Sequence, residues 1–148
     1  MVIIKPFKGF TPKSDLADKI SSPPYDVMNI EEARKLADGN ELSFLHVVKA
    51  EINFPPNADI SKADVNNKAK DKLEELISSQ NLVQDKTSCL YIYQQAIGKH
   101  KQIGLVAGFS CDEYDKNIVK KHEFTRPDKE KDRTDHINTL GVNSGPIF

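Results

Sequence analysis

The chain of 148 residues is long enough for one domain with a sizeable core, and too short for us to expect two. Apolar residues make up 38% of it and charged residues 29%, a composition typical of a soluble globular protein and not of a disordered one. The formal net charge is −1, so no global field draws the protein to nucleic acid or to a membrane. Any anion binding must therefore come from local clusters of basic residues.

The cysteines and the last residues bear on location and on domain organisation. Cys89 and Cys111 lie apart without a CxxC spacing, so we expect buried, reduced thiols in a cytoplasmic protein. No run of residues reads as a membrane span. Ile147 and Phe148 follow a Gly-Pro turn and look like the opening of a strand. We therefore expect residues 1–148 to be a single N-terminal domain of a longer protein, with the missing C-terminal region as its partner.

Short elements are predicted for the first part of the chain. The apolar segment Val2–Phe7 predicts a strand, and two prolines make Ser21–Asp26 a loop. Asn29, with a glutamate three residues later, is placed to cap a helix over residues 30–38. The nearly continuous apolar run Ser43–Val48 predicts a central strand.

The middle of the chain predicts a long helix and a hairpin. Ser61 is placed to cap an amphipathic helix over residues 62–79. Two β-rich runs, Cys89–Ile97 and Gln102–Ser110, are joined by Gly98-Lys99-His100 and predict a hairpin. This order of elements predicts an α+β fold, with a mixed, mainly antiparallel sheet and two or three packed helices.

After Asp112 the chain becomes highly charged. Thr125 is placed to cap a helix that Gly141 ends after Leu140. At helical spacing the charges of this segment fall into two stripes. The basic stripe consists of Arg126, Lys129, Arg133 and His136, and the acidic stripe consists of Asp128, Asp132 and Asp135.

The start of this helix predicts an anion site. Unpaired backbone N–H groups and the partial positive charge of the helix N-terminus would lie beside Lys121, His122 and Arg126. An arginine binds phosphate or carboxylate through two parallel hydrogen bonds. The alternative is a solvated helix whose mixed charges form weak pairs, worth about 0.2–0.5 kcal/mol each. On the charges alone, the solvated helix is the more common outcome.

Other polar residues are weaker candidates. The rigid Pro-Pro loop presents Ser22, Tyr25 and Asp26, which would hold a polar substrate or support the basic stripe, although a structural turn is the alternative. His46 lies in an apolar run, where a core histidine is more common than a ligand. No zinc-type spacing occurs, so no metal ligands are predicted, and the expected metal is Mg²⁺ arriving with a phosphate donor.

Five segments carry a resemblance to a known family: IIKPFKGFTP, SSPPYDV, EEARKLADGNELSFLHV, LVQDKTSCLYIY and KHEFTRPDKEKDRTDHI. In this order, over essentially the whole chain, they resemble the bacterial and archaeal family catalogued as domain of unknown function 1015. That family is distantly similar to the ParB/sulfiredoxin-like group, which includes nucleotide hydrolases, a sulfinic-acid reductase and kinases of free serine. The resemblance implies a ParB/sulfiredoxin-like fold and a phosphate-handling cytoplasmic enzyme. The chain departs from that group in having Thr125-Arg126-Pro127 where a GxxR motif would precede a helix.

The residues and the resemblance together predict a phosphotransferase or phosphohydrolase acting on a small polar metabolite. Free serine is the best single substrate, with a nucleotide or pyrophosphate as donor. In this hypothesis Lys121, Arg126, Lys129 and Arg133 bind phosphate oxygens, Glu123 or Glu130 takes the proton of the attacking hydroxyl, and His122 or His136 donates to the leaving oxygen. Two alternatives stay open. One is a non-enzymatic module that senses a ligand or contacts a partner, and the weaker one is nucleic-acid binding, which the acidic stripe opposes.

Overall fold

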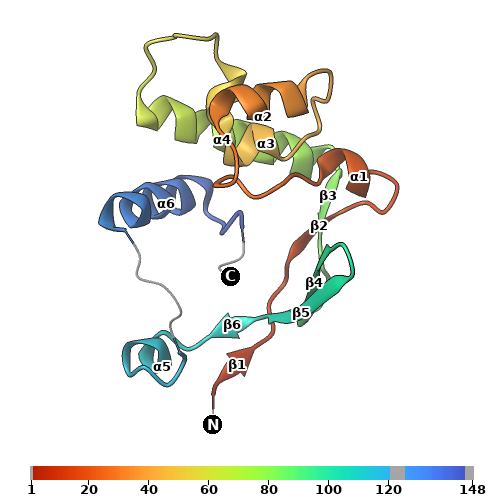
Figure 1. Cartoon of the computed structure of the whole chain (residues 1–148), viewed down its shortest axis with the longest axis vertical. Coiled ribbons are helices and arrows are strands. Elements are labelled where there is room, and N and C mark those ends of the chain that lie inside the picture. The colour runs from red at the N-terminus through yellow and green to blue at the C-terminus, as the bar shows by residue number, and fades with distance from the viewer. Residues whose placement is uncertain (1, 121–125, 146–148) are drawn as a thin grey trace. The chain divides into compact units, whose positions relative to one another are not determined.

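The computed structural model describes residues 2–120 and 126–145 (Figure 1). Helices and short antiparallel sheets together confirm the predicted α+β class. The chain divides into two compact units. We call Met1–Thr11 with Gln84–Thr125 the hairpin unit, and Pro12–Val83 with Arg126–Phe148 the helical unit. The expectation that residues 1–148 form one domain stays a prediction.

The helical unit holds most of the buried apolar side chains. Its helices are α1 (Ala17–Ile20), α2 (Ile30–Ala37), α3 (Leu45–Val48), the 3-10 helix η1 (Ala50–Asn53), α4 (Lys62–Ser78) and α6 (Pro127–Leu140). α4 packs against both α3 and α6, as Figure 1 shows. A core cluster lies between α2, α3 and η1, and its buried members are Ala33, Ala37, Leu45 and Ile52.

Two of the predicted helices, α2 and α4, are confirmed together with their caps. In α2, the Asn29 side chain accepts from the backbone N–H of Glu32 at 2.9 Å, and the Glu32 carboxylate accepts from Asn29 at 2.8 Å. α4 begins with the same reciprocal pair, formed by Ser61 and Asp64. Each pair satisfies two backbone donors that the helix itself leaves unpaired, which is why local sequence alone places these starts.

The predicted strand Ser43–Val48 is wrong, because this segment contains the helical turn α3. Leu45 and Val47 are both fully buried, so the apolar run has the composition of a buried strand without being one. The Asn53 side chain donates to the carbonyls of His46 at 3.0 Å and Ala50 at 2.9 Å. These bonds satisfy backbone acceptors at the end of the turn, so the segment needs no neighbouring strand.

The hairpin unit is built on a pair of antiparallel strands. β4 (Tyr91–Ile97) pairs with β5 (His100–Val106) in a register that runs unbroken from Tyr91↔Val106 to Ile97↔His100. The predicted hairpin is confirmed, but its turn is Gly98-Lys99 alone, with His100 already paired. Gly98 has φ of 59°, as the first central position of a tight hairpin turn requires.

The remaining strands are very short. The predicted strand Val2–Phe7 is reduced to β1 (Ile4–Lys5), because Phe7 leaves that pairing and bridges to Cys89 instead. Among the described residues the strands form three two-stranded sheets, not one mixed sheet. The other elements are β2 (Phe10–Pro12), β3 (Leu82–Gln84), β6 (Gly108–Phe109), which pairs with β1, and the helix α5 (Cys111–Asp115).

Both cysteines are free thiols, but the prediction that they are buried is wrong. Cys89 is half-buried and Cys111 is exposed, because Cys111 opens the short surface helix α5. Neither α1 nor α5 was predicted, since helices of four and five residues carry too few turns for an apolar period. None of the helices in the described ranges is long and apolar enough to cross a membrane.

Candidate functional site

The charged helix of the sequence is α6, and it begins one residue later than predicted. Its N-cap is Arg126, with φ of −86° and ψ of 126°, and Pro127 is the first helical residue. A proline pushes its predecessor into extended geometry, which is the geometry of an N-cap, so Pro127 fixes the start. Thr125, the predicted N-cap, lies outside the described residues. Gly141 ends the helix as predicted, with φ of 72°.

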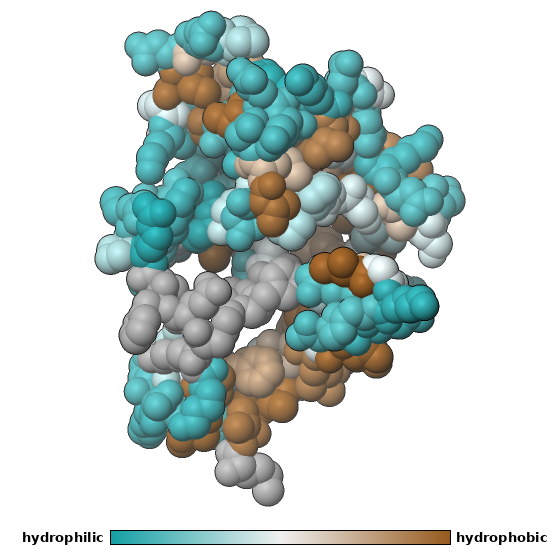
Figure 2. All heavy atoms as spheres, viewed as in Figure 1, coloured by the Kyte–Doolittle hydropathy of each residue, from teal (hydrophilic) through white to brown (hydrophobic). Residues whose placement is uncertain are grey.

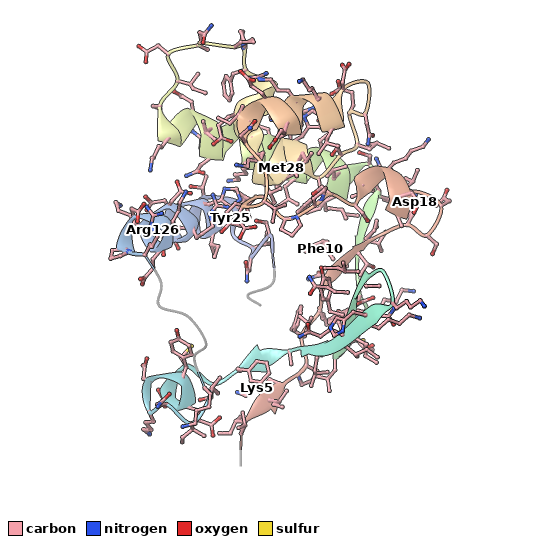
Figure 3. The ribbon with its side chains drawn as sticks, viewed as in Figure 1. Lys5, Phe10, Asp18, Tyr25, Met28 and Arg126 are labelled. Atoms are coloured by element: carbon pink, nitrogen blue, oxygen red, sulfur yellow. The ribbon has the colours of Figure 1, made fainter. Side chains whose placement is uncertain are left out.

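The basic stripe of α6 meets the Pro-Pro loop at one point. The guanidinium carbon of Arg133 lies 4.4 Å from the ring centroid of Tyr25, within the range of a cation–π contact. Figure 3 shows Tyr25 beside α6, with Arg126 further along the same helix. Two candidates more than a hundred positions apart in sequence are thus joined in one place.

The loop that carries Tyr25 is anchored on both sides. Before it, Ile20 is buried and its carbonyl accepts from the backbone N–H of Phe44 at 2.8 Å. After it, Met28 packs against the core cluster of α2, α3 and η1. Tyr25 therefore reaches Arg133 from a segment whose two ends are fixed in the core.

Asp132 restrains the guanidinium group of Arg133 through a hydrogen bond. One carboxylate oxygen accepts from Arg133 Nη2 at 2.8 Å, and the other lies 3.5 Å from Lys62 Nζ on α4. Partial burial raises the pKa of Asp132, but the hydrogen bond and charge of Arg133, with Lys62, outweigh it and lower the pKa overall. Asp132 is therefore a carboxylate at neutral pH, and it leaves only part of the guanidinium free.

His136, the last residue of the basic stripe, lies inside the protein. It is only 3% exposed, with Nδ1 at 3.2 Å from Asn66 Oδ1 and Nε2 at 3.2 Å from Ser144 Oγ. Burial, and then the nearby charge of Arg133, lower its pKa to about 4, against the opposing effect of Asp132. The imidazole is neutral at pH 7. Its Nδ1–H then donates to Asn66, and Nε2 accepts from the Ser144 hydroxyl.

This arrangement predicts an acid-sensitive helical unit. Unfolded His136 takes up a proton near pH 6.5, whereas the folded residue does so only near pH 4, so acid favours unfolding between these values. The contribution is complete above pH 6.5 and is lost as the pH falls towards 4. Between about pH 7 and about pH 5 we expect the free energy of unfolding to fall by about 1–2 kcal/mol, allowing for residual contact with water.

Urea unfolding at several pH values tests this. The variant His136→Gln cannot titrate and should show a flatter dependence than the wild type over this range. His100→Gln, at an exposed histidine of β5, is the control and should keep the wild-type slope. Equal slopes for the wild type and His136→Gln would contradict the assignment.

The outer part of the basic stripe lies in solvent. Arg126 is exposed and pairs with Asp128 at 2.9 Å, and Lys129 and Glu130 are exposed on the same turn. In the Pro-Pro loop, Ser22 is half-buried and Asp26 is exposed. The predicted site residues Lys121, His122 and Glu123 lie outside the described residues.

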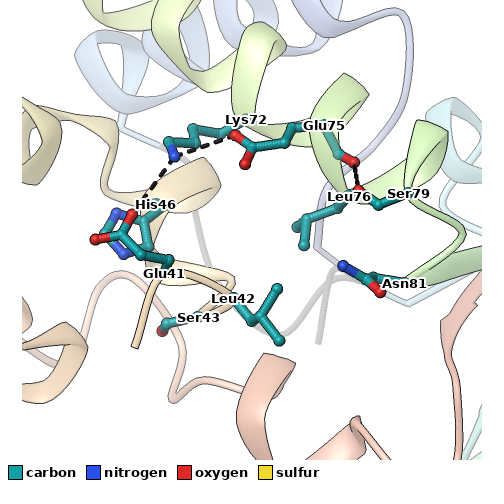
Figure 4. A pocket seen from close by; sticks show the side chains of 9 residues that line it. All are labelled: Glu41, Leu42, Ser43, His46, Lys72, Glu75, Leu76, Ser79 and Asn81. Atoms are coloured by element: carbon teal, nitrogen blue, oxygen red, sulfur yellow. Dashed lines mark hydrogen bonds and ion pairs between the residues drawn. The ribbon is translucent and has the colours of Figure 1, made fainter. Parts of the chain in front are cut away.

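A separate small pocket lies between α3 and α4 (Figure 4). Lys72 is its main cation, and it lies 3.1 Å from Glu75 and 3.6 Å from Glu41. His46 also lines the pocket, with its ring nitrogens at 2.8 Å from Asn53 Oδ1 and 3.2 Å from the Asn40 carbonyl. The carboxylates outnumber the lysine, so this pocket does not suit a phosphate.

Three partners of the site were not predicted from the sequence: Lys62, Asn66 and Ser144. Lys62 and Asn66 are four apart on α4, and the residues they meet, Asp132 and His136, are four apart on α6. Residues four apart share one face of a helix, so the two contacts form a ladder between the helices. The matching spacing is a usable signal, but only once α4 and α6 are known to be neighbours.

Within the described residues, no three His, Cys, Asp or Glu side chains lie together as a metal site. The sequence belongs to the family DUF1015, described as "Protein of unknown function", which matches residues 4–148. No curated protein and no solved structure matches the chain.

Proposed function

We propose that the protein is a phosphate-handling enzyme acting on a small polar metabolite, and that the basic stripe of α6 binds the phosphate. Free serine is the proposed substrate, and a nucleotide or pyrophosphate is the proposed donor. The observation that supports this most strongly is the fixed position of Arg133 between Tyr25 and Asp132.

Arg133 combines restraint with access. One face of its guanidinium lies on Tyr25 and one nitrogen is bound to Asp132, yet the side chain is 30% exposed. A guanidinium has five N–H donors, so donors remain for two phosphate oxygens. Because the group is already oriented, binding costs little side-chain entropy. A solvated arginine such as Arg126, 72% exposed, lacks this advantage.

The other residues would act around this anchor. Arg126, Lys129 and, from outside the described residues, Lys121 would neutralise further phosphate oxygens. Glu123 or Glu130 would take the proton from the attacking hydroxyl, and His122 would donate to the leaving oxygen. His136 is buried and neutral, so its proposed role is to position Asn66 and Ser144 and not to transfer protons. The part of the site that holds the substrate would be lined by Ser22, Tyr25 and Asp26.

Mg²⁺ would fit this scheme only as a companion of the donor. It is usually held by one or two carboxylates together with substrate phosphates. Of the acidic residues nearest the anchor, Asp132 is bound to Arg133 and Asp128 to Arg126. Both carboxylates are therefore already engaged by arginines and are poorly suited to hold a metal ion.

The test is to measure by calorimetry the binding of pyrophosphate, ADP and ATP to the whole chain. We expect Arg133→Ala to weaken pyrophosphate binding by about 10- to 100-fold, because a hydrogen bond to a charged group is worth about 1.5–3 kcal/mol. Arg126→Ala should have a smaller effect. Lys131→Ala, at a lysine paired with Asp135 at 3.1 Å outside the basic stripe, is the control and should leave affinity unchanged. Unchanged affinity in Arg133→Ala for all three ligands would refute the proposal.

A second candidate is a non-enzymatic module that senses a phosphorylated ligand. The burial of His136, with both ring nitrogens engaged, favours it, since it removes one histidine from acid–base work. Turnover separates the two. An enzyme should form phosphoserine from serine with one of the three donors, whereas a module should bind a donor without consuming it.

A further inference from the structure

A buried histidine holds the hydroxyl of Ser144 close to the proposed phosphate anchor, Arg133. Gly141 ends α6 with φ of 72° and turns the chain, and Ser144 Oγ lies 3.2 Å from Nε2 of His136. From the other side, α4 places Asn66 Oδ1 at 3.2 Å from Nδ1 of the same ring. Arg133 and His136 are neighbours on one face of α6, at a spacing that puts Cβ atoms about 5–6 Å apart. Ser144 therefore borders the part of α6 that carries the anchor.

The contacts of His136 fix the direction of its hydrogen bonds. The side-chain oxygen of Asn66 can only accept, so Nδ1 of the imidazole carries the proton. The ring is 3% exposed, and its burial keeps it neutral at pH 7. A neutral imidazole has one N–H group, so Nε2 is an acceptor and the Ser144 hydroxyl donates to it.

Ser144 therefore offers a ligand only lone pairs. A hydroxyl has one proton to donate, and in Ser144 that proton is engaged by His136. Among the described residues His136 is the one hydrogen-bond partner of Ser144 Oγ, and Ser144 is half-buried, not enclosed. A ligand group that binds this oxygen must be a donor. Phosphate and carboxylate oxygens, which only accept, are unsuited to it.

We propose that Ser144 is a further substrate-binding residue, and that its oxygen accepts a hydrogen bond from the amine of a phosphorylated amino metabolite. This role rests on the proposed function, because Arg133 would hold the phosphate while Ser144 holds the amine. In serine, the hydroxyl that receives the phosphate and the ammonium group are on neighbouring carbons. Side chains about one helical turn apart can therefore hold both groups at once.

The charges around Ser144 suit an ammonium group. A charged donor makes a hydrogen bond roughly twice as strong as a neutral one. Asp132, a carboxylate at neutral pH, lies one helical turn before His136, and its negative charge offsets the repulsion between Arg133 and an ammonium group. The surface over α6 is hydrophilic, as Figure 2 shows. A phosphate alone would need neither an acceptor oxygen nor a carboxylate here.

The test compares O-phosphoserine with the same molecule carrying hydrogen in place of the amine. In calorimetry, the wild-type chain should bind O-phosphoserine about tenfold more tightly, because a hydrogen bond to a charged group contributes at least about this factor. Ser144→Ala should remove this preference by weakening the binding of O-phosphoserine alone. Ser144→Thr keeps a hydroxyl and should keep the preference. Ser78→Ala, at the exposed last residue of α4, is the control and should bind both ligands as the wild type does.

The protonation of the His136 ring gives a second result, which needs no ligand. Nitrogen-15 NMR of the wild-type chain at pH 7 should show Nδ1 protonated and Nε2 unprotonated, with the signals assigned by their absence in His136→Gln. A proton on Nε2 would make Ser144 the acceptor and free its own proton for the ligand. That result would overturn the proposal.

The binding results also separate the role of Ser144 from the phosphate site itself. If the wild type binds the two ligands equally and Arg133→Ala weakens both, the role of Ser144 is overturned and the phosphate site stands. If Ser144→Ala weakens both ligands equally, its contact with His136 is only structural and the role is again overturned. If neither ligand binds the wild type, the role of Ser144 and the phosphate site fail together.

Discussion

Replacing Leu45 by alanine is expected to lower the free energy of unfolding by about 2–5 kcal/mol. Leu45 is 1% exposed and belongs to the core cluster with Ala33, Ala37 and Ile52. Two of its neighbours are alanines, which have no side-chain freedom with which to fill the space that is lost. A cavity therefore remains, and its cost adds to the lost transfer free energy of the removed methyl and methylene groups.

This loss would be a large fraction of the total free energy of unfolding. Domains are stable by about 5–15 kcal/mol, so one such cavity removes a sizeable share. Urea unfolding followed by far-ultraviolet circular dichroism measures it, since most of the helix lies in this unit. Leu36→Ala is the control, at a leucine of α2 that is 57% exposed, and it should change stability by no more than about 0.5 kcal/mol. Similar losses in the two variants would show that the cluster is not the core of the unit.

Leu45 also marks the limit of what the sequence predicts about the fold. The starts of α2 and α4 follow from Asn29 and Ser61, because a capping box is a local arrangement within four residues. The run Ser43–Val48 is different. Burial on all sides makes a short helix and a strand look alike, and the helical form depends on contacts from outside the run, such as the hydrogen bond from the Asn53 side chain to the His46 carbonyl.

The candidate site divides in the same way. The basic stripe could be predicted, since Arg126, Lys129, Arg133 and His136 follow the period of one helix. The sequence could not predict which end of the stripe is exposed and which is buried, because that depends on contacts from α4 and from the Pro-Pro loop. Sequence spacing gives the face of a helix, whereas tertiary packing decides which of its charges is oriented, which is solvated and which titrates abnormally.

Gly9 provides the second large effect, in the hairpin unit. We expect Gly9→Ala to destabilise this unit by about 1–3 kcal/mol, as overpacking typically does. A Cβ atom at this position would lie 2.7 Å from Tyr91 Oη and 2.9 Å from its Cζ, closer than real Cβ contacts come. Either the backbone at Gly9 or the Tyr91 ring would have to move.

Tyr91 cannot move without losing its own contacts. Its hydroxyl accepts from the Gly9 backbone N–H at 2.6 Å and donates to Asp85 at 2.5 Å, and its ring centroid lies 5.0 Å from that of Phe7. The hydrogen bond to Asp85 is the main reason why the pKa of Tyr91 is raised, so the hydroxyl stays protonated as the donor. The added methyl group would therefore disrupt the contacts of Tyr91, through which three segments of the chain are held together.

The destabilisation of the hairpin unit can be tested by limited proteolysis, with the free energy of unfolding measured in parallel. Gly104→Ala on β5 is the matched control, because its nearest non-neighbouring atom, the Tyr93 carbonyl oxygen, would lie 3.9 Å from the new Cβ. Gly9→Ala should be cleaved faster than the wild type, and Gly104→Ala should not. Since Glu113 is the one buried residue in the described part of this unit, little else opposes local opening there. If the two variants are cleaved alike, the contact between Gly9 and Tyr91 is not what holds β4 to the N-terminal segment.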